Sequence, residues 1–276
     1  MEMEKKLKEE LHSFENMWKG GYYEGNPLDP MGESGYGILG YMSVLHVIYL
    51  ACIKPYVNEN SFVLEIGPGR GAWTKTFIHQ KAKEIWCLDV LSAEHNRFWE
   101  YIGHENKDKT KYIQVADFTC NDLPDQKFNY LFSFGALCHI SFAGITEYMK
   151  NLYSKLVDGG QCFIMVADYE KYNNAIRNIN RLSVFRIIDS VKSRKYYKKY
   201  IYNFIKLFLE QLIIKTKCDL KPLKMPEDDV ARSGRWYNAG IEKTCDMLEK
   251  LGYKVIAPDM GVSNRDPIIH FCKPKL

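Results

Sequence analysis

The feature that most constrains the fold is a short apolar run followed by three evenly spaced glycines, Ser-Phe-Val-Leu-Glu-Ile-Gly-Pro-Gly-Arg-Gly-Ala-Trp-Thr over residues 61–74. Phe62 to Ile66 has the length and composition of a buried strand, and Ala72 to Gln80 predicts a helix. Glycines between a strand and a helix allow a sharp turn and a close approach of a ligand to the backbone. This unit predicts an α/β fold with a ligand at the turn.

The spacing of Gly67, Gly69 and Ala72 also satisfies the relaxed dinucleotide fingerprint, so the glycines alone leave the cofactor open. Glu65 helps to identify the cofactor. Burying a carboxylate at the end of a strand costs free energy unless the carboxylate has a partner. A ligand ammonium group would be a suitable partner, and a pyrophosphate would not. The string resembles motif I of the class I S-adenosylmethionine (SAM)-dependent methyltransferases, in which an acidic residue precedes Gly-x-Gly-x-Gly.

The rest of the chain supports this resemblance over roughly residues 40–168 and 236–272. Apolar, β-branched runs predict further strands at 84–89, 111–115, 127–134, 161–167, 253–257 and 266–272. Apolar periodicity and stop signals predict helices at 2–19, 41–54, 142–156 and 236–251, with Asp158-Gly159-Gly160 as the stop of the third. The resemblance implies an α/β fold: a Rossmann-like seven-stranded methyltransferase sheet with an N-terminal helical segment, closed by an antiparallel pair that a nicotinamide-binding sheet lacks.

Asp89 ends the second predicted strand and lies twenty residues beyond Gly69. In dinucleotide folds an acid at this distance accepts from the ribose hydroxyls, and the resemblance implies the same role toward SAM. The alternative is that Asp89 caps a helix beginning near Ser92. The resemblance further implies that Asp117 accepts from the adenine amine and that Phe118 stacks on the ring. An ordinary turn-forming aspartate is the alternative for Asp117.

The other predicted cofactor-binding residues are Glu65, Gly67, Gly69, Phe134, Tyr22 and Tyr23. The two tyrosines belong to a twenty-residue segment, 20–40, without helix or strand pattern. Such long segments are often functional lids, so we expect this one to cover cofactor or substrate; a surface connector is the alternative.

The fourth strand runs into Gly135–Ser141, where class I methyltransferases carry motif IV. The Asn/Asp-Pro-Pro-Tyr sequence of DNA and protein amide methylation is absent, and His139 stands there instead. A histidine suits proton removal near neutral pH, so His139 is the candidate general base for a hydroxyl acceptor. The alternative is a histidine that packs or orients the acceptor.

The formal net charge of +4 conceals an asymmetry along the chain. Between Lys171 and Lys224 there are fourteen Lys or Arg residues and three acids, so the rest of the chain is net acidic. We divide the chain into N-terminal helices and covering loop (1–54), a SAM-binding core (55–168 and 236–276) and a basic helical cap inserted between strands five and six (169–235). A cleft lined by one sign of charge concentrates oppositely charged ligands, which predicts an anionic acceptor. A solvated helix face is the alternative.

Several classes of protein are disfavoured by the composition. The chain contains no run of about 18 apolar residues, so we expect no membrane-spanning helix. The charged N-terminus is unlike a secretory signal. Eight cysteines without a C-x-x-C pair favour a reduced, cytoplasmic compartment. No Cys/His cluster has zinc-ligand spacing, so we expect no metal. The oligomeric state stays open.

The predicted function is transfer of a methyl group from SAM to an oxygen, less readily a nitrogen, of a small anionic metabolite such as a phosphorylated or nucleotide-linked sugar or capsule precursor. This follows a resemblance to small-molecule methyltransferases of bacterial sugar, capsule or natural-product pathways. One alternative is an NAD(P)-dependent oxidoreductase, which Glu65 and the closing hairpin disfavour. Another is a nucleic-acid-binding methyltransferase that uses the basic, tyrosine-rich cap. The helical spacing of the cap's aromatic and aliphatic residues disfavours it.

Overall fold

The computed structural model describes residues 2–14, 21–22, 25–30, 43–175, 236–263 and 265–275. The chain divides into two compact units, residues 1–168 with 226–276, and residues 169–225. The sheet and the candidate site belong to the first unit. Tyr23 and residues 176–235 of the expected cap lie outside the described residues, so the domain boundaries and the role of the cap remain predictions.

The described residues form a seven-stranded sheet with the order β3-β2-β1-β4-β5-β7-β6. Strands β1 to β5 are parallel, whereas β7 runs antiparallel to both of its neighbours. The strands are β1 (Phe62–Ile66), β2 (Glu84–Asp89), β3 (Thr110–Gln114), β4 (Phe128–Ser133), β5 (Leu156–Met165), β6 (Lys254–Ala257) and β7 (Ile268–Cys272). This arrangement confirms the predicted sheet and its closing hairpin.

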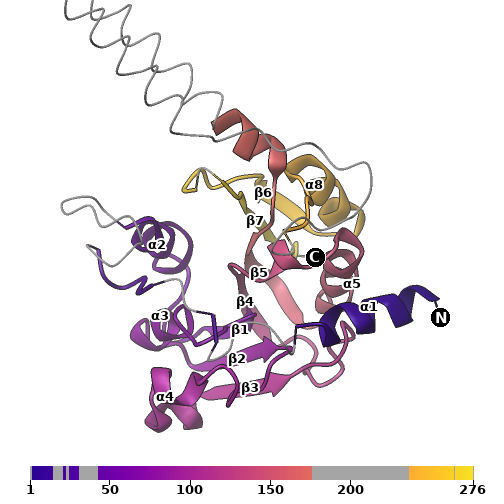
Figure 1. The fold of residues 1–276 in the computed structure, drawn as a ribbon. Coiled ribbons are helices and arrows are strands. Elements are labelled where there is room, and N and C mark those ends of the chain that lie inside the picture. The colour runs from indigo at the N-terminus through magenta and orange to yellow at the C-terminus, as the bar shows by residue number, and fades with distance from the viewer. Residues whose placement is uncertain are drawn as a thin grey trace, which may run out of the picture. The chain divides into compact units, whose positions relative to one another are not determined.

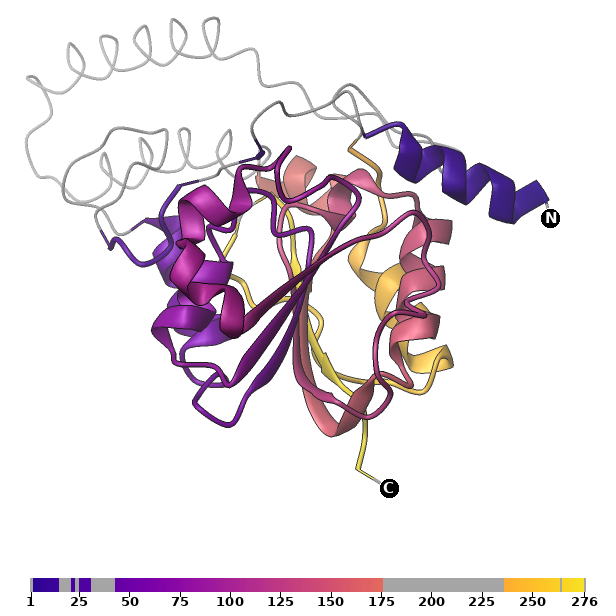
Figure 2. The same ribbon diagram turned by 90° about the horizontal axis from the view of Figure 1, so that it is seen from below.

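Helices cover both faces of the sheet (Figures 1 and 2). On one side lie α2 (Val44–Ile48), continued by a π-helix (Tyr49–Ile53), α3 (Thr74–His79) and α4 (Phe98–Ile102). On the other side lie α5 (Phe142–Leu152), α8 (Ile241–Lys250) and the N-terminal helix α1 (Glu2–His12). Two short 3₁₀ helices, His104–Asp108 and Leu137–His139, connect strands to their neighbours.

Two hydrophobic cores fill the spaces between the sheet and these helices, because successive side chains of a strand point to opposite faces. In β1, Leu64 and Ile66 join the core on the α5 side, and Val63 joins the core on the α3 side. The middle strand β4 is buried along most of its length, as expected for a parallel strand covered on both faces. The apolar runs were readable as strands for this reason.

The structure corrects the predicted boundary between α5 and β5. Helix α5 ends at Leu152, and Asp158-Gly159-Gly160, predicted to stop the helix, lies within β5. The register between β4 and β5 shifts here, so that β5 contains extra residues opposite β4. Gly159, with φ +81°, donates its N–H to the carbonyl oxygen of Lys273 at 2.8 Å. The glycines therefore extend the pairing of β5 with β7 to the chain that follows β7.

Two helices are shorter than predicted. Helix α8 begins at Ile241, where the N–H of that residue donates to Asp168 Oδ2 at 2.8 Å. Helix α1 ends at His12. None of the helices in the described part of the chain is long and apolar enough to span a membrane.

Candidate functional site

A pocket opens at the carboxyl edge of the parallel strands. It is lined by Gly67 and Gly69 after β1, Asp89 at the end of β2, and Gly135 and Ala136 after β4. In open α/β sheets the crevice outside the carboxyl ends of the strands is where ligands bind. The pocket is therefore the candidate site of the chain.

The glycine turn is held in a conformation that side chains would disrupt. Gly67 has φ +70°, and a Cβ atom there would lie 2.2 Å from the Cβ atom of Ala136. Gly69 has φ +52°, and its Cβ atom would lie 2.8 Å from the carbonyl oxygen of Tyr22. Both positions therefore require glycine for conformation and for space.

Part of the predicted covering segment lies directly on this turn. The N–H of Arg70 donates to the carbonyl oxygen of Tyr22 at 3.1 Å, and Tyr22 lines the pocket. Gly21, with φ +78°, packs so closely on Asn96 that a Cβ atom would lie 2.4 Å from its carbonyl oxygen. Gly21 and Tyr22 are thus docked by backbone contacts, which residue patterns in the sequence do not reveal.

Asp89 is held by the backbone around it. Its Oδ2 accepts from the N–H of Gly69 at 3.2 Å, and its Oδ1 accepts from the N–H of Leu91 at 2.9 Å. Because α4 begins only at Phe98, Asp89 does not cap that helix. Burial raises the pKa of Asp89 to about 6, against the opposing effect of hydrogen bonds from the backbone of Leu91, Gly69 and Val90 and from the side chain of Asn96. The carboxylate lines the pocket as an acceptor.

Asn96 adds a second acceptor beside Asp89. Its Nδ2 donates to the hydroxyl of Tyr112 at 2.7 Å, and that hydroxyl donates its single proton to the carbonyl oxygen of Leu91 at 2.8 Å. This fixes the orientation of the amide, since the Tyr112 hydroxyl can only accept from Asn96. Oδ1 of Asn96 is buried and has no donor among the described residues. A ligand hydroxyl group would satisfy it.

Glu65 lies outside the pocket lining, on the α3 side of β1. The side chain is 1% exposed, and its Oε2 accepts from Thr74 Oγ1 at 2.6 Å. The thiol of Cys87 lies 3.6 Å from the same oxygen. Burial raises the pKa of Glu65 to about 7, and the two hydrogen bonds oppose that shift. Its predicted contact with a ligand ammonium group stays a prediction.

Three other predicted residues also lie outside the lining. The carboxylate of Asp117 accepts from the N–H of Thr119 at 2.9 Å and from its hydroxyl at 2.7 Å, so in this structure it forms a turn. Phe118 is buried behind Tyr148, with ring centroids 4.6 Å apart. Phe134 packs on Trp73, with ring centroids 4.9 Å apart.

His139 is the predicted catalytic residue that the structure brings to the pocket. It ends the short 3₁₀ helix after β4, where its N–H donates to the carbonyl oxygen of Ala136 at 3.0 Å. The half-buried side chain lines the same pocket as Gly67 and Asp89. The turn after β4 therefore positions a titratable group close to the glycine turn.

Several lining residues were not singled out as site residues from the sequence. Leu11 and Phe14, from and just after α1, line the pocket, and so do Asn96 and Tyr148. For Leu11 and Phe14 the amphipathic pattern of the N-terminal helix was the available signal. Tyr148 shares a helical face with Ile145, a pattern that is equally typical of a core residue, whereas Asn96 carries no sequence signal.

The chemistry of the lining fits a nucleoside cofactor without phosphates. Among the described lining residues there is no Lys or Arg that would pair with a pyrophosphate. The lining offers instead the acceptor oxygens of Asp89 and Asn96, suited to ribose hydroxyls, and apolar side chains suited to a base.

A family model described as a methyltransferase domain matches residues 48–201. The chain belongs to this methyltransferase family. It is a class I methyltransferase whose cofactor is SAM, as the motif I resemblance implied. The residues of the pocket, above all the two glycines and Asp89, fit that cofactor.

Solved structures share the fold of this methyltransferase. A protein from Listeria monocytogenes, proposed to be a SAM-dependent methyltransferase, is 16% identical, with a TM-score of 0.51 over 84% of this chain and 98% of that one. The 1,6-didemethyltoxoflavin-N1-methyltransferase of Burkholderia thailandensis, solved with 1,6-didemethyltoxoflavin and S-adenosylhomocysteine, is 10% identical, with a TM-score of 0.52 over 84% of this chain and 78% of that one. At these identities the likeness concerns the fold.

One relative in sequence is Hemolysin A of Brachyspira hyodysenteriae. It is 26% identical to this methyltransferase over 98 residues, which are 36% of this chain. The match spans 38% of the length of that relative.

Proposed function

We propose that this methyltransferase moves the methyl group of SAM to an oxygen of a small anionic metabolite, such as a phosphorylated or nucleotide-linked sugar or capsule precursor. A nitrogen acceptor is the less favoured form of the same proposal. The observation that carries it is His139, which lies in the same pocket as the glycine turn and Asp89. A hydroxyl acceptor must lose its proton during methylation, and a general base at this position can take that proton.

Bound SAM supplies a methyl group already activated by its sulfonium. Catalysis by the chain then consists of holding cofactor and acceptor in line and keeping water away. Asp89 and Asn96 would accept from the ribose hydroxyls, and the turn at Gly67 and Gly69 would admit the amino-acid end against the backbone. The apolar lining around Ile140 excludes water.

His139 would take the proton of a hydroxyl acceptor at a ring nitrogen as the oxygen–methyl bond forms and the sulfur–methyl bond of the cofactor breaks, with S-adenosylhomocysteine as the leaving group. General base catalysis contributes about 100- to 10,000-fold, so His139→Ala should lower kcat by a factor in that range. The matched control is the exposed His104→Ala, at the edge of the molecule beyond α4. A His139→Ala enzyme with full kcat across pH 6 to 9 would refute the assignment.

The anionic character of the acceptor rests on the basic segment 171–224, of which residues 171–175 are described. Arg and Lys hold phosphate groups through charge-assisted hydrogen bonds. A suitable assay offers methyl-labelled SAM with pairs of acceptors, each a sugar phosphate or nucleotide sugar and its dephosphorylated counterpart. We expect the labelled methyl group to be found on an oxygen atom of the phosphorylated acceptor in each pair that reacts.

Ionic strength tests the same point independently. Because the Debye length falls to about 10 Å at 0.1 M salt, kcat/KM for the acceptor should fall as salt is added while SAM affinity changes little. A salt-independent kcat/KM, or transfer only to the neutral member of each pair, would contradict an anionic acceptor.

A further inference from the structure

Tyr148, on α5, has a hydroxyl group that the fold leaves unused. The residue is 2% exposed, and its side chain lines the cofactor pocket. No hydrogen bond joins its hydroxyl to another of the described residues, and its oxygen is not one of the fully enclosed unpaired atoms, so it is open to the pocket. Polar groups in protein interiors are normally paired with protein or water. A phenol that faces a ligand pocket without a protein partner therefore points to a partner on the ligand.

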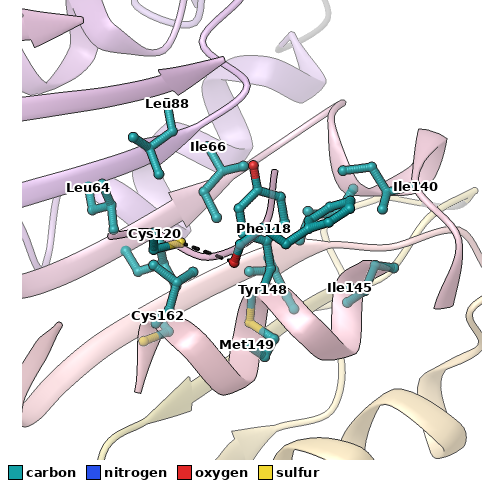
Figure 3. Close-up of a cluster of buried hydrophobic side chains, with 14 of the residues drawn as sticks. Leu64, Ile66, Leu88, Phe118, Cys120, Ile140, Ile145, Tyr148, Met149 and Cys162 are labelled. Atoms are coloured by element: carbon teal, nitrogen blue, oxygen red, sulfur yellow. Dashed lines mark hydrogen bonds between the residues drawn. The ribbon is translucent and has the colours of Figure 1, made fainter. Parts of the chain in front are cut away.

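The packing of the ring fixes where this hydroxyl lies. Phe118 meets the ring edge to face, with centroids 4.6 Å apart and planes at 84°. In Figure 3 the hydroxyl oxygen of Tyr148 points away from α5 and toward Ile66 of β1, which also lines the pocket. A phenol packed in this way has little freedom to turn toward another partner.

The electrostatic surroundings keep this group a donor. Burial raises the pKa of Tyr148 well above its ordinary value, and the nearby Cys120, Asp89 and Asp117 raise it further. The phenol is therefore protonated at neutral pH and can donate. Tyr148 lines the same pocket as Asp89, which marks the ribose side, and as apolar side chains suited to the adjoining base.

We propose that the hydroxyl of Tyr148 donates a hydrogen bond to a ring nitrogen of the adenine base of SAM. In this chain the phenol then contributes to the recognition of the base that the resemblance to class I methyltransferases had implied for Asp117. Asp117 is engaged by Thr119 and lies outside the lining, whereas Tyr148 lies inside it. The proposal rests on SAM occupying the pocket.

The test is calorimetric titration of Tyr148→Phe with S-adenosylhomocysteine and with 5′-methylthioadenosine, which lacks the amino-acid end. A neutral hydrogen bond is worth about 0.5–1.5 kcal/mol, so Kd should rise roughly 3- to 10-fold for both ligands. The matched control is Tyr153→Phe, the residue just after α5, whose hydroxyl lies 3.5 Å from the carbonyl oxygen of Gly252. Its Kd values should equal those of the wild type.

Deaza analogues of S-adenosylhomocysteine, each lacking N1, N3 or N7, identify the partner atom. For one of them the wild type and Tyr148→Phe should bind equally, because the accepting nitrogen is gone. Melting of the ligand-free protein checks folding: Tyr148→Phe removes no internal hydrogen bond, so its melting temperature should not fall.

Four outcomes would overturn the proposal. Unchanged Kd values in Tyr148→Phe would show that the phenol makes no hydrogen bond to the cofactor, and that it contacts the methyl acceptor or no ligand at all. A loss confined to S-adenosylhomocysteine would place it against the amino-acid end, and a loss that persists with all three deaza analogues would exclude the ring nitrogens. A wild-type protein that binds neither nucleoside would overturn the cofactor assignment and this proposal together, so the two failures are distinguishable.

Discussion

At the scale of single residues, Glu65 is the most unusual group near the site. It is an acid almost without solvent exposure, on a central strand, and its Oε2 accepts hydrogen bonds from Thr74 and Cys87. Neither neighbour carries a positive charge, so the folded protein favours the protonated carboxyl. In the ligand-free protein, Glu65 should therefore contribute to the dependence of stability on pH.

The sign follows from the two pKa values. The folded-state pKa of Glu65 is raised to about 7 from an ordinary 4.5, so its contribution to stability is fully present below pH 4.5 and is lost as the pH rises through 7. Relative to the wild type, Glu65→Gln should gain stability between these values, by at most a few kcal/mol since one pKa unit is about 1.4 kcal/mol.

Urea unfolding of both proteins at a series of pH values measures the difference. The exposed Glu59→Gln is the control and should show no such trend. A stability difference between Glu65→Gln and wild type that does not vary with pH would show that Glu65 is ionised in the folded protein.

The sequence predicted individual site residues where backbone position alone decides their place. Gly67, Gly69 and Asp89 follow directly from strand ends, and all three line the pocket. Asp117 and Phe134 also follow strands, but their side-chain directions depend on Thr119 and Trp73, which a strand pattern does not encode. Their assigned contacts with SAM remain predictions.

At the scale of elements, helix α1 is joined to the start of helix α5 by the carboxylate of Glu10. Glu10 Oε1 accepts from the N–H of Ser141 at 2.6 Å, and its Oε2 accepts from the Ser141 hydroxyl at 2.7 Å. Ser141 also caps α5, since its Oγ accepts from the N–H of Gly144 at 3.2 Å. The same serine therefore begins α5 and anchors α1, which brings Leu11 to the pocket.

A double-mutant cycle tests this anchor. Glu10→Gln and Ser141→Ala should each destabilise the protein by about 1–2 kcal/mol, from the lost charged hydrogen bonds and the lost cap. The double variant should lose less than the sum, with a coupling of about 1 kcal/mol. Glu9→Gln, which removes only an exposed pair with Lys5 at 3.8 Å, should change stability by less than about 0.5 kcal/mol.

Urea unfolding gives all of these values. If the free-energy changes of Glu10→Gln and Ser141→Ala are additive, the two side chains do not act together and α1 is held by its apolar face alone.

The existence of the elements was predictable from the sequence, and their ends were less so. Strands β1 and β2 were predicted to the residue, because glycine or acidic residues mark where each apolar run stops. The start of β5 was wrong because Gly159 and Gly160 resemble a helix stop, whereas their pairing with Lys273 is a contact across more than 100 residues. Such pairing cannot be read from local pattern.

At the scale of the whole first unit, the strand order explains why distant residues meet. The order β3-β2-β1-β4 places the ends of β1, β2 and β4 side by side, so Gly67, Asp89 and Ala136 line one pocket. The antiparallel β7 closes the opposite half of the sheet. This topology was expected from the resemblance to class I methyltransferases, and it is the frame on which the SAM site depends.

The most direct test of the account is calorimetric titration of S-adenosylhomocysteine into the wild type, Asp89→Asn and Asp125→Asn. Asp125 is an exposed aspartate in the loop before β4, paired with Lys155 at 2.8 Å. Charge-assisted hydrogen bonds are worth about 1.5–3 kcal/mol, so Asp89→Asn should weaken binding by about 10- to 100-fold, with Asp125→Asn unchanged. A wild type that does not bind, or an Asp89→Asn variant that binds as tightly as the wild type, would contradict the pocket as the SAM site.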